Sequence, residues 1–140
     1  MDRAILGGCR CGLIRYRFNK APTFKHICCC RDCQYFTGTD KIFVVGGNRE
    51  TFALLKGTPI SYCVVADSGA TIARAFCGDC GSSLFIYPKI DGVHYKAEDD
   101  VIEVSAGTLD DPNAFSPDFA VFVSRAPAWA AFPKDLPLHE

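Results

Sequence analysis

The sequence Cys28-Cys29-Cys30-Arg31-Asp32-Cys33 places four cysteines within six residues. Two cysteine pairs lie far from it along the chain, Cys9-Arg10-Cys11 before it and Cys77-Gly78-Asp79-Cys80 after it. In a reducing compartment, cysteines at such short spacings more often bind metal or carry out chemistry than form disulfides. The odd total of 9 cysteines also fits a disulfide framework badly. The three groups therefore predict metal sites around which the chain is organised.

The composition predicts a single domain over residues 1–140 and excludes several classes of function. A chain of 140 residues has the size of one ordinary domain. Its 15 Lys and Arg against 16 Asp and Glu form no basic stripe of the kind that nucleic-acid-binding proteins carry. No run of about 20 apolar residues predicts a membrane span, and the N-terminus has no apolar core of signal-peptide length. We therefore expect a cytoplasmic protein that binds neither nucleic acid nor membrane.

Hydrophobic alternation predicts a mainly β domain with short helices. Ile14, Tyr16 and Phe18 are expected to face the core, and Arg15 and Arg17 to face water. The alternating and apolar runs, bounded by glycine and proline turns, predict extended segments over residues 5–8, 13–18, 24–28, 42–45, 51–55, 60–65, 71–76, 82–87, 101–106 and 120–124. Residues 91–100 are polar and are expected to form a surface loop, and the proline-rich tail is expected to pack or wrap without a long helix.

The two outer cysteine pairs, Cys9 with Cys11 and Cys77 with Cys80, form the first candidate site. A Cys-x-x-Cys-Gly turn lets two sulfurs converge on one tetrahedral ion, and the tighter Cys-x-Cys spacing is compatible with the same ion. Four thiolates complete the coordination of zinc, which predicts a structural ion that joins two distant parts of the domain. Redox pairs and buried thiols without metal are the alternatives.

The central stretch supplies a second candidate site with one ligand fewer. Cys28, Cys30 and Cys33 offer three sulfurs, and a short helix expected over residues 31–36 would place Cys30 and Cys33 on one side of its first turn. Three protein ligands leave a position for water or substrate, as in catalytic zinc sites. Because a thiol that coordinates zinc is deprotonated, this site would deliver a sulfur nucleophile to a small electrophile.

Other residues near the central stretch leave alternatives open. Cys29 is expected to point away from the ligands and to be a packed thiol, although it could replace Cys28 as a ligand. Cys63 lies in an apolar strand and is expected in the core. His26 could orient a ligand or donate a proton, but a lone histidine on a strand is more often structural. The whole stretch could instead hold one structural zinc with spare thiols, or carry out redox chemistry at the Cys-x-x-Cys formed by residues 30–33.

Four motifs in order carry a family resemblance over residues 7–129. They are GGCRCGLIRY at residues 7–16, CCCRDCQ at residues 28–34 followed by Thr37-Gly38, FCGDCGS at residues 76–82 and VFVSRAPAW at residues 121–129. These motifs resemble the glutathione-dependent formaldehyde-activating enzyme family, which usually has histidine at the position of Cys29. The resemblance implies a β-tent fold of mostly antiparallel strands, with a structural zinc held by Cys9, Cys11, Cys77 and Cys80 and a catalytic zinc held by Cys28, Cys30 and Cys33.

The resemblance also implies an activity and its partners. The implied enzyme is a carbon–sulfur lyase that forms S-hydroxymethylglutathione from formaldehyde and glutathione, with two zinc ions per chain, of which the second is lost more easily. Its partners would be a small thiol such as glutathione and a small aldehyde, and Arg31, Gln34 and Trp129 are candidate glutathione contacts. Two other functions stay open, a non-enzymatic zinc-binding interaction module and a thiol reductase resembling the β-tent methionine sulfoxide reductases.

Overall fold

The computed structural model describes residues 4–89 and 100–140, which form two β-sheets and short helices. The strand order is β1-β2-β5 in the three-stranded sheet and β10-β3-β4-β9-β8-β7-β6 in the seven-stranded sheet. Neighbouring strands are antiparallel, except that β10 pairs with β3 in parallel. The expected mainly β fold, with mostly antiparallel strands and short helices, is confirmed. The elements are β1 (Ile5–Gly8), β2 (Arg15–Phe18), β3 (Phe24–Cys28), α1 (Arg31–Thr37), β4 (Ile42–Asn48), η1 (Arg49–Thr51), β5 (Phe52–Lys56), β6 (Ile60–Val65), β7 (Thr71–Phe76), β8 (Ser83–Pro88), β9 (Val101–Ser105), η3 (Ala106–Thr108), β10 (Phe119–Val121) and η4 (Val123–Arg125).

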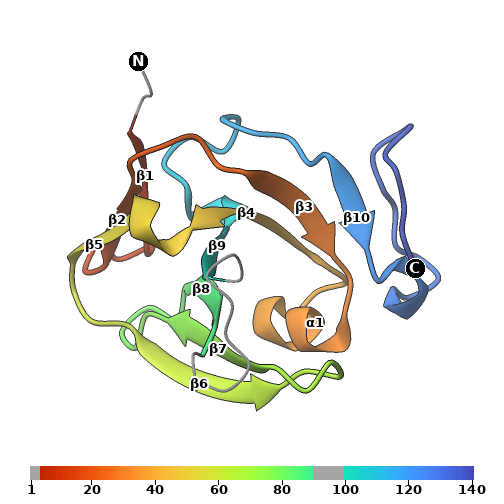
Figure 1. Cartoon of the computed structure of the whole chain (residues 1–140), viewed down its shortest axis with the longest axis horizontal. Coiled ribbons are helices and arrows are strands. Elements are labelled where there is room, and N and C mark those ends of the chain that lie inside the picture. Colours follow the sequence, from red (N-terminus) through yellow and green to blue (C-terminus); the bar gives the residue numbers. More distant parts are fainter. Residues whose placement is uncertain (1–3, 90–99) are drawn as a thin grey trace.

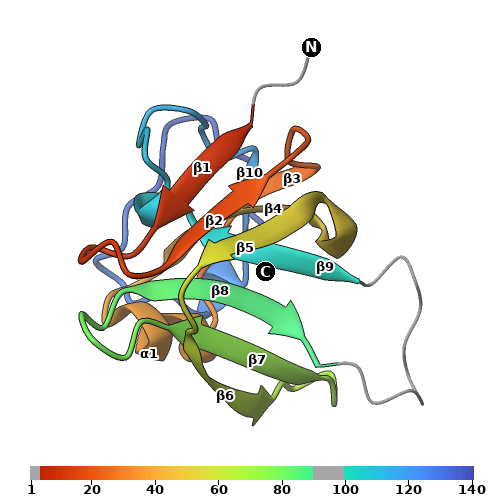
Figure 2. The same cartoon turned by 90° about the vertical axis from the view of Figure 1, so that its left-hand side faces the viewer.

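The large sheet curves around α1, and the small sheet covers its outer side (Figures 1 and 2). The main hydrophobic core lies between the two sheets, where Tyr16 and Phe18 of β2 meet Val45, Phe85 and Val104 of the large sheet. Burial of these side chains supplies the main driving force that holds the sheets together. The expectation that Ile14, Tyr16 and Phe18 face the core is therefore confirmed.

The two arginines of β2 are less exposed than their alternation predicts. Arg15 and Arg17 lie on the face of β2 opposite the core and are partly exposed, so the expected alternation is confirmed although neither side chain is fully exposed. Arg15 donates from Nη1 to Oδ1 of Asp110 at 2.9 Å, and Nη2 forms a second contact with Oδ2 of the same carboxylate. This two-pronged ion pair covers the guanidinium with the segment that follows η3.

The last strand is shorter than the sequence predicts. An extended segment was expected over residues 120–124, but β10 ends at Val121 because Phe122 adopts a left-handed backbone with φ of 55° and the η4 turn follows. The tail then returns to β10 and forms two backbone hydrogen bonds with Ala120. The amide of Ala120 donates to the carbonyl of Pro137 at 2.9 Å, and the amide of His139 donates to the carbonyl of Ala120 at 2.8 Å. The tail therefore wraps against the sheet, as expected. The loop expected over residues 91–100 lies outside the described residues, apart from Asp100.

The concave face of the large sheet carries several polar side chains next to α1. Arg74 lies opposite Ile86, which in turn lies opposite Glu103, so these three residues project from the same face. Ile86 and Val44 pack with Phe36 of α1, which identifies this face as the one that the helix covers. In the described ranges, no helix is long and apolar enough to cross a membrane.

Candidate metal centres

Four cysteines meet where the two sheets come together, and we call them the closed cluster: Cys9, Cys11, Cys77 and Cys80. The first pair comes from the turn between β1 and β2 in the small sheet, and the second from the turn between β7 and β8 in the large sheet. Each turn is closed by its own hydrogen bonds, since Gly12 N donates to the carbonyl of Cys9 at 3.1 Å and Gly81 N to that of Cys77 at 2.8 Å. Both glycines have positive φ, 82° and 78°, which a side chain would disfavour.

The sulfur positions of the closed cluster fit a tetrahedral metal ion. The four sulfurs lie within 4.8 Å of one another, with Cys9 and Cys11 at 3.5 Å and Cys11 and Cys77 at 3.7 Å. A zinc ion with four thiolates at about 2.3 Å places neighbouring sulfurs about 3.8 Å apart. Hydrogen bonds from the side chain and backbone of Ser82 lower the pKa of Cys80 to about 5, which favours the thiolate form that a metal requires.

Three cysteines meet beneath the large sheet, and we call them the open cluster: Cys28, Cys30 and Cys33. Cys28 is the last residue of β3, Cys30 caps the N-terminus of α1, and Cys33 lies in the first turn of that helix. The Cys30 side chain accepts a hydrogen bond from the amide of Cys33 at 3.4 Å. Gly38 ends the helix in a left-handed conformation, as the sequence predicted. The three sulfurs lie within 4.8 Å of one another and fit one zinc ion with a fourth position for another ligand.

The electrostatics of the open cluster favour one anionic sulfur. Hydrogen bonds from the side chains of Cys28 and Cys33 lower the pKa of Cys30 to about 2. The same contacts raise the pKa of Cys28, whose thiol is largely buried.

A buried arginine contacts the open cluster from the facing strand. Both terminal nitrogens of Arg74 on β7 donate to Sγ of Cys33 at 3.7 Å, and its guanidinium stacks over the ring of Phe36 with 5.4 Å between Cζ and the ring centroid. The Arg74 side chain is 5% exposed. Burial acts to lower the pKa of Arg74, but the charge of Cys33 and its hydrogen bonds raise that pKa overall.

Other polar groups on the concave face lack partners among the described residues. The buried atoms without a hydrogen bond include Nε of Arg74, Nδ1 of His26 and Oγ of Ser105. His26 stacks on Phe119 at 5.2 Å, and burial lowers its pKa. Burial also raises the pKa of Glu103 to about 7, against the opposing influence of Arg74. Buried polar groups normally find partners, so these unpaired atoms distinguish this face from the rest of the core.

The two remaining cysteines lie apart from both clusters. Cys29 is fully buried and packs with Ile27 and Ala120, so it points away from the open cluster, as expected. Cys63 is exposed on β6, so the expectation that it lies in the core is wrong. The reason is position within the sheet: β6 is an edge strand, and apolar composition alone does not separate an edge strand from a central one.

The three candidate glutathione contacts line one hollow on the outer side of α1. This hollow has a volume of about 430 Å³ and is bounded by Arg31, Gln34, Tyr35 and Trp129. The amide nitrogen of Gln34 already makes two hydrogen bonds within the protein. Its Nε2 donates to the carbonyl of Cys29 at 2.8 Å and to the carbonyl of Arg125 at 3.0 Å. Arg31 stacks over the ring of the exposed Tyr35, with 4.8 Å between Cζ and the ring centroid. Arg31 in turn donates from Nη1 to Oε1 of Gln34, so all three residues line the hollow, with Arg31 and Gln34 already bonded to each other.

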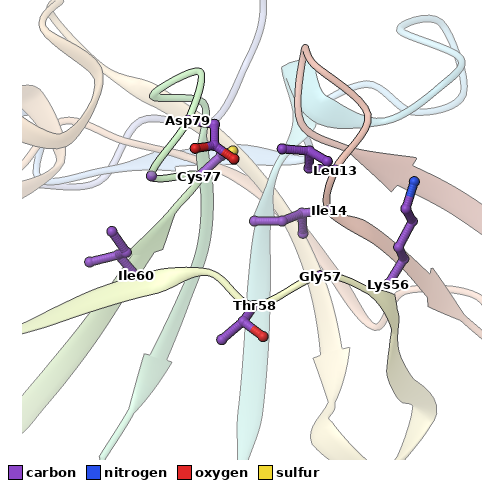
Figure 3. A pocket seen from close by; sticks show the side chains of 9 residues that line it. Leu13, Ile14, Lys56, Gly57, Thr58, Ile60, Cys77 and Asp79 are labelled. Carbon is purple, nitrogen blue, oxygen red and sulfur yellow. The ribbon is translucent and has the colours of Figure 1, made fainter.

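A second hollow adjoins the closed cluster (Figure 3). It measures about 450 Å³ and lies between the start of β2, the connection from β5 to β6 and the turn that carries Cys77. Leu13, Ile14 and Ile60 make much of its wall apolar, while Lys56 and Asp79 are its charged members. No residue of the open cluster lines it, so this hollow is separate from the three-sulfur site.

Arg74 and Glu103 are the site residues that the sequence analysis missed. Both stand within apolar strands, in Thr71-Ile72-Ala73-Arg74-Ala75-Phe76 and in Val101-Ile102-Glu103-Val104. A single charge inside an apolar run was the available signal, because charged side chains are seldom buried without a partner. Arg74 and Cys33 are 41 residues apart in the sequence and meet only in the folded structure. No local sequence pattern reveals such a contact.

Comparisons with known proteins identify a matching family model and a structure of similar fold. A family model described as glutathione-dependent formaldehyde-activating enzyme matches residues 4–125. No curated protein matches the chain. Among solved structures, a crystal structure of a Rhodobacter sphaeroides protein is similar, with a TM-score of 0.56 and 15% identity over 78% of this chain and 91% of that chain. At this identity the likeness concerns the fold alone.

Proposed function

The chain belongs to the glutathione-dependent formaldehyde-activating enzyme family, and we propose that it is a zinc-dependent carbon–sulfur lyase acting on a small thiol and a small aldehyde. In the proposed reaction the thiol sulfur forms a bond to the aldehyde carbon, and the π bond of the carbonyl breaks. The thiol proton ends on the carbonyl oxygen. With glutathione and formaldehyde the product is S-hydroxymethylglutathione, and the reverse reaction breaks the same carbon–sulfur bond.

The difference in ligand number between the two clusters carries this proposal. The closed cluster has four sulfurs, whereas the open cluster has three, drawn from one strand end and one helix start. Zinc bound by Cys28, Cys30 and Cys33 would hold an incoming thiol as a thiolate at neutral pH. The protein would supply the three ligands in a fixed arrangement, set by the end of β3 and the first turn of α1.

The surroundings of the open cluster support a role in binding a charged thiol. Val44, Ile86 and Phe36 form an apolar wall next to the sulfurs, which strengthens electrostatic interactions there relative to water. Arg31 follows Cys30 directly and lines the hollow on the outer side of α1 together with Trp129. We propose that this hollow receives the peptide part of the thiol and that Arg31 pairs with one of its carboxylates.

The main test compares Cys30→Ser with Cys63→Ser. Cys30→Ser is expected to keep the fold and one zinc ion per chain while turnover of formaldehyde and glutathione falls below detection. Cys63→Ser is the matched control, because it removes an exposed thiol that belongs to neither cluster and should keep both ions and full turnover. Metal content per chain, circular dichroism and product formation are the measurements. A wild-type chain that holds a single zinc ion and nevertheless turns over would contradict the proposal.

The same samples separate the two other functions. An interaction module would hold both ions tightly and would show no thiol exchange at the open cluster. A thiol reductase would contain thiols that react quickly with an alkylating reagent in the native, zinc-loaded protein, at Cys30 and Cys33 first.

A separate experiment tests whether the hollow on the outer side of α1 binds glutathione. Arg31→Ala is expected to raise KM for glutathione about tenfold while leaving kcat within about twofold, since removing a binding contact that is equal in ground and transition state changes KM alone. Arg10→Ala, which removes an exposed arginine beside the closed cluster, is the control and should leave KM unchanged.

A further inference from the structure

We propose that Arg74 is a positioning residue that makes the open cluster select an anionic sulfur ligand over a neutral one. This inference rests on the proposed function, because it concerns the ligand that the three-cysteine site accepts. Arg74 would act through Cys33 and would not touch the reacting carbon. Four observations support the proposal: burial, hydrogen bonding, charge balance and the contrast with the closed cluster.

Arg74 is buried in a way that requires an anion beside it. A buried guanidinium carries a large desolvation cost unless a negative group compensates it. Among the described residues Arg74 forms no ion pair with a carboxylate within 4 Å, and its only hydrogen-bond acceptor is Sγ of Cys33. The sulfurs of Cys33 and Cys30 are therefore the main negative groups beside Arg74, with a smaller contribution from Asp32 in the first turn of α1.

The acidic group on the same face is poorly suited to replace the sulfur as the partner of Arg74. Glu103 projects from the concave face, and burial raises its pKa to about 7, so near neutral pH much of it is uncharged. The charge of Arg74 therefore remains available to the sulfurs. The ring of Phe36 and the neighbouring strand hold the guanidinium in place, which keeps that charge at a fixed distance from Cys33.

Charge counting gives the direction of the effect. Three thiolates and one divalent cation together carry a net charge of −1. The positive charge of Arg74 brings the net charge of the site to zero. A neutral fourth ligand leaves this sum unchanged, whereas a thiolate adds one negative charge to a cluster whose Cys33 sulfur contacts a buried cation. An opposite charge within about 4–6 Å favours an ionised group by about one to three pKa units, which corresponds to a preference of about tenfold or more.

The closed cluster lacks this arrangement. Its sulfurs receive hydrogen bonds from Ile14 N to Cys9 at 3.2 Å and between the hydroxyl of Ser82 and Cys80 at 3.2 Å. Among the described residues no arginine nitrogen donates to any of its sulfurs. A buried arginine is therefore a specific property of the three-sulfur site.

The experiment measures ligand binding at the metal, without turnover. The protein is loaded with two Co²⁺ ions per chain, because the absorption of cobalt reports each new sulfur ligand. Glutathione and 2-mercaptoethanol are titrated as thiols, and imidazole is titrated as a neutral ligand. Arg74→Met is expected to weaken thiol binding about tenfold or more and to leave imidazole binding within about twofold. Arg74→Lys, which keeps the positive charge, should recover most of the thiol affinity.

Matched controls keep the result interpretable. Arg49 also stacks on an aromatic ring, with 4.5 Å between Cζ and the centroid of Tyr87, but it donates to no cysteine sulfur in the described structure. Arg49→Met should bind both ligand types as the wild type does. If Arg74→Met does not fold, Arg74→Gln removes the charge while keeping a hydrogen-bond donor.

Two outcomes would overturn this inference, and a third would overturn the proposed function instead. Equal thiol affinity in wild type and the uncharged variants would show that the charge is irrelevant. An equal loss of thiol and imidazole binding would show that Arg74 only supports the structure. If the wild type binds no thiol at the open cluster at all, the proposed lyase function itself fails.

Discussion

The closed and open clusters use the same ligand atom, but they are built in different ways. The closed cluster joins two turns that are distant in sequence, one from each sheet, and Cys11 is exposed. The open cluster comes from a single short stretch, and two of its three cysteines are buried between the large sheet and α1. The first arrangement connects two layers of the protein, whereas the second places three cysteines that could hold a metal on a protected face.

The difference teaches which part of the structure depends on metal. At the closed cluster the two turns belong to separate sheets, so a metal ion bound there would contribute directly to holding the sheets together. At the open cluster the polypeptide is already positioned by sheet pairing, by helix capping and by the amide of Gln34. We expect that loss of metal from the closed cluster unfolds the protein. Loss of metal from the open cluster is expected only to inactivate it.

The largest expected effect comes from breaking the closed cluster. Cys77→Ser removes a buried ligand that joins the sheets, and it should lower the free energy of unfolding by several kcal/mol, with an upper limit on the order of 10 kcal/mol. Thermal unfolding and metal content per chain provide the measurement, with Cys63→Ser as control. If the Cys77→Ser protein keeps the Tm of the wild type, the closed cluster has no structural role.

A chelator should distinguish the clusters by rate. The metal at the open cluster is expected to leave at least about tenfold faster, because three protein ligands hold it instead of four. Turnover should disappear with this first phase, while circular dichroism should change only with the second. Cys30→Ser should show the slow phase alone. Simultaneous loss of both ions together with unfolding would contradict the distinction between the two sites.

Gln34→Ala tests whether the protein itself holds the open cluster. The buried amide joins the carbonyls of Cys29 and Arg125, and its removal should lower the free energy of unfolding by about 2–4 kcal/mol with or without metal at the open cluster. Asn113→Ala, which removes an exposed amide, is the control and should change stability little. Urea unfolding of both variants before and after chelation gives the comparison. A loss that appears only in the metal-loaded protein would mean that metal, and not the amide, positions this stretch.

The smallest expected effect is a pH dependence near the open cluster. Burial raises the pKa of Glu103 to about 7 from its ordinary 4.5, so the folded state retains a proton that the unfolded state has lost between these values. The resulting stability is fully present below the unfolded pKa and is lost as the pH rises through the folded pKa. Relative to Glu103→Gln, the free energy of unfolding of the wild type should fall by about 2 kcal/mol between about pH 5 and pH 8. A difference that is independent of pH would mean that Glu103 is ionised in the folded protein.

Local patterns predicted much of the fold. The bounds of β3, β6 and β7 agree with the extended segments expected from the sequence, and α1 extends only one residue beyond its expected end. Cysteine spacing also identified the two groups of sulfurs that the structure brings together. These features depend on neighbours within a few residues, where turn chemistry and side-chain alternation act directly.

The errors arise where distant parts of the chain decide the outcome. Cys63 has the sequence surroundings of a core residue, but the sheet order places its strand at an edge. Phe122 interrupts an apolar run with a left-handed backbone at the point where the returning tail pairs with residues on either side of it. Arg74 meets Cys33 only after β7 and α1 come together across the curved sheet. In each case tertiary pairing overrides a local preference.

The separation of Cys11 from Cys77 by 66 residues has a consequence for how the chain matures during synthesis. The open cluster is complete once Cys33 has left the ribosome, whereas the closed cluster must wait for Cys80. A metal ion that arrives early therefore meets the three-sulfur site first, and closing the longer loop carries a larger entropic cost. The site that is complete first during synthesis is therefore the one expected to release its metal more easily.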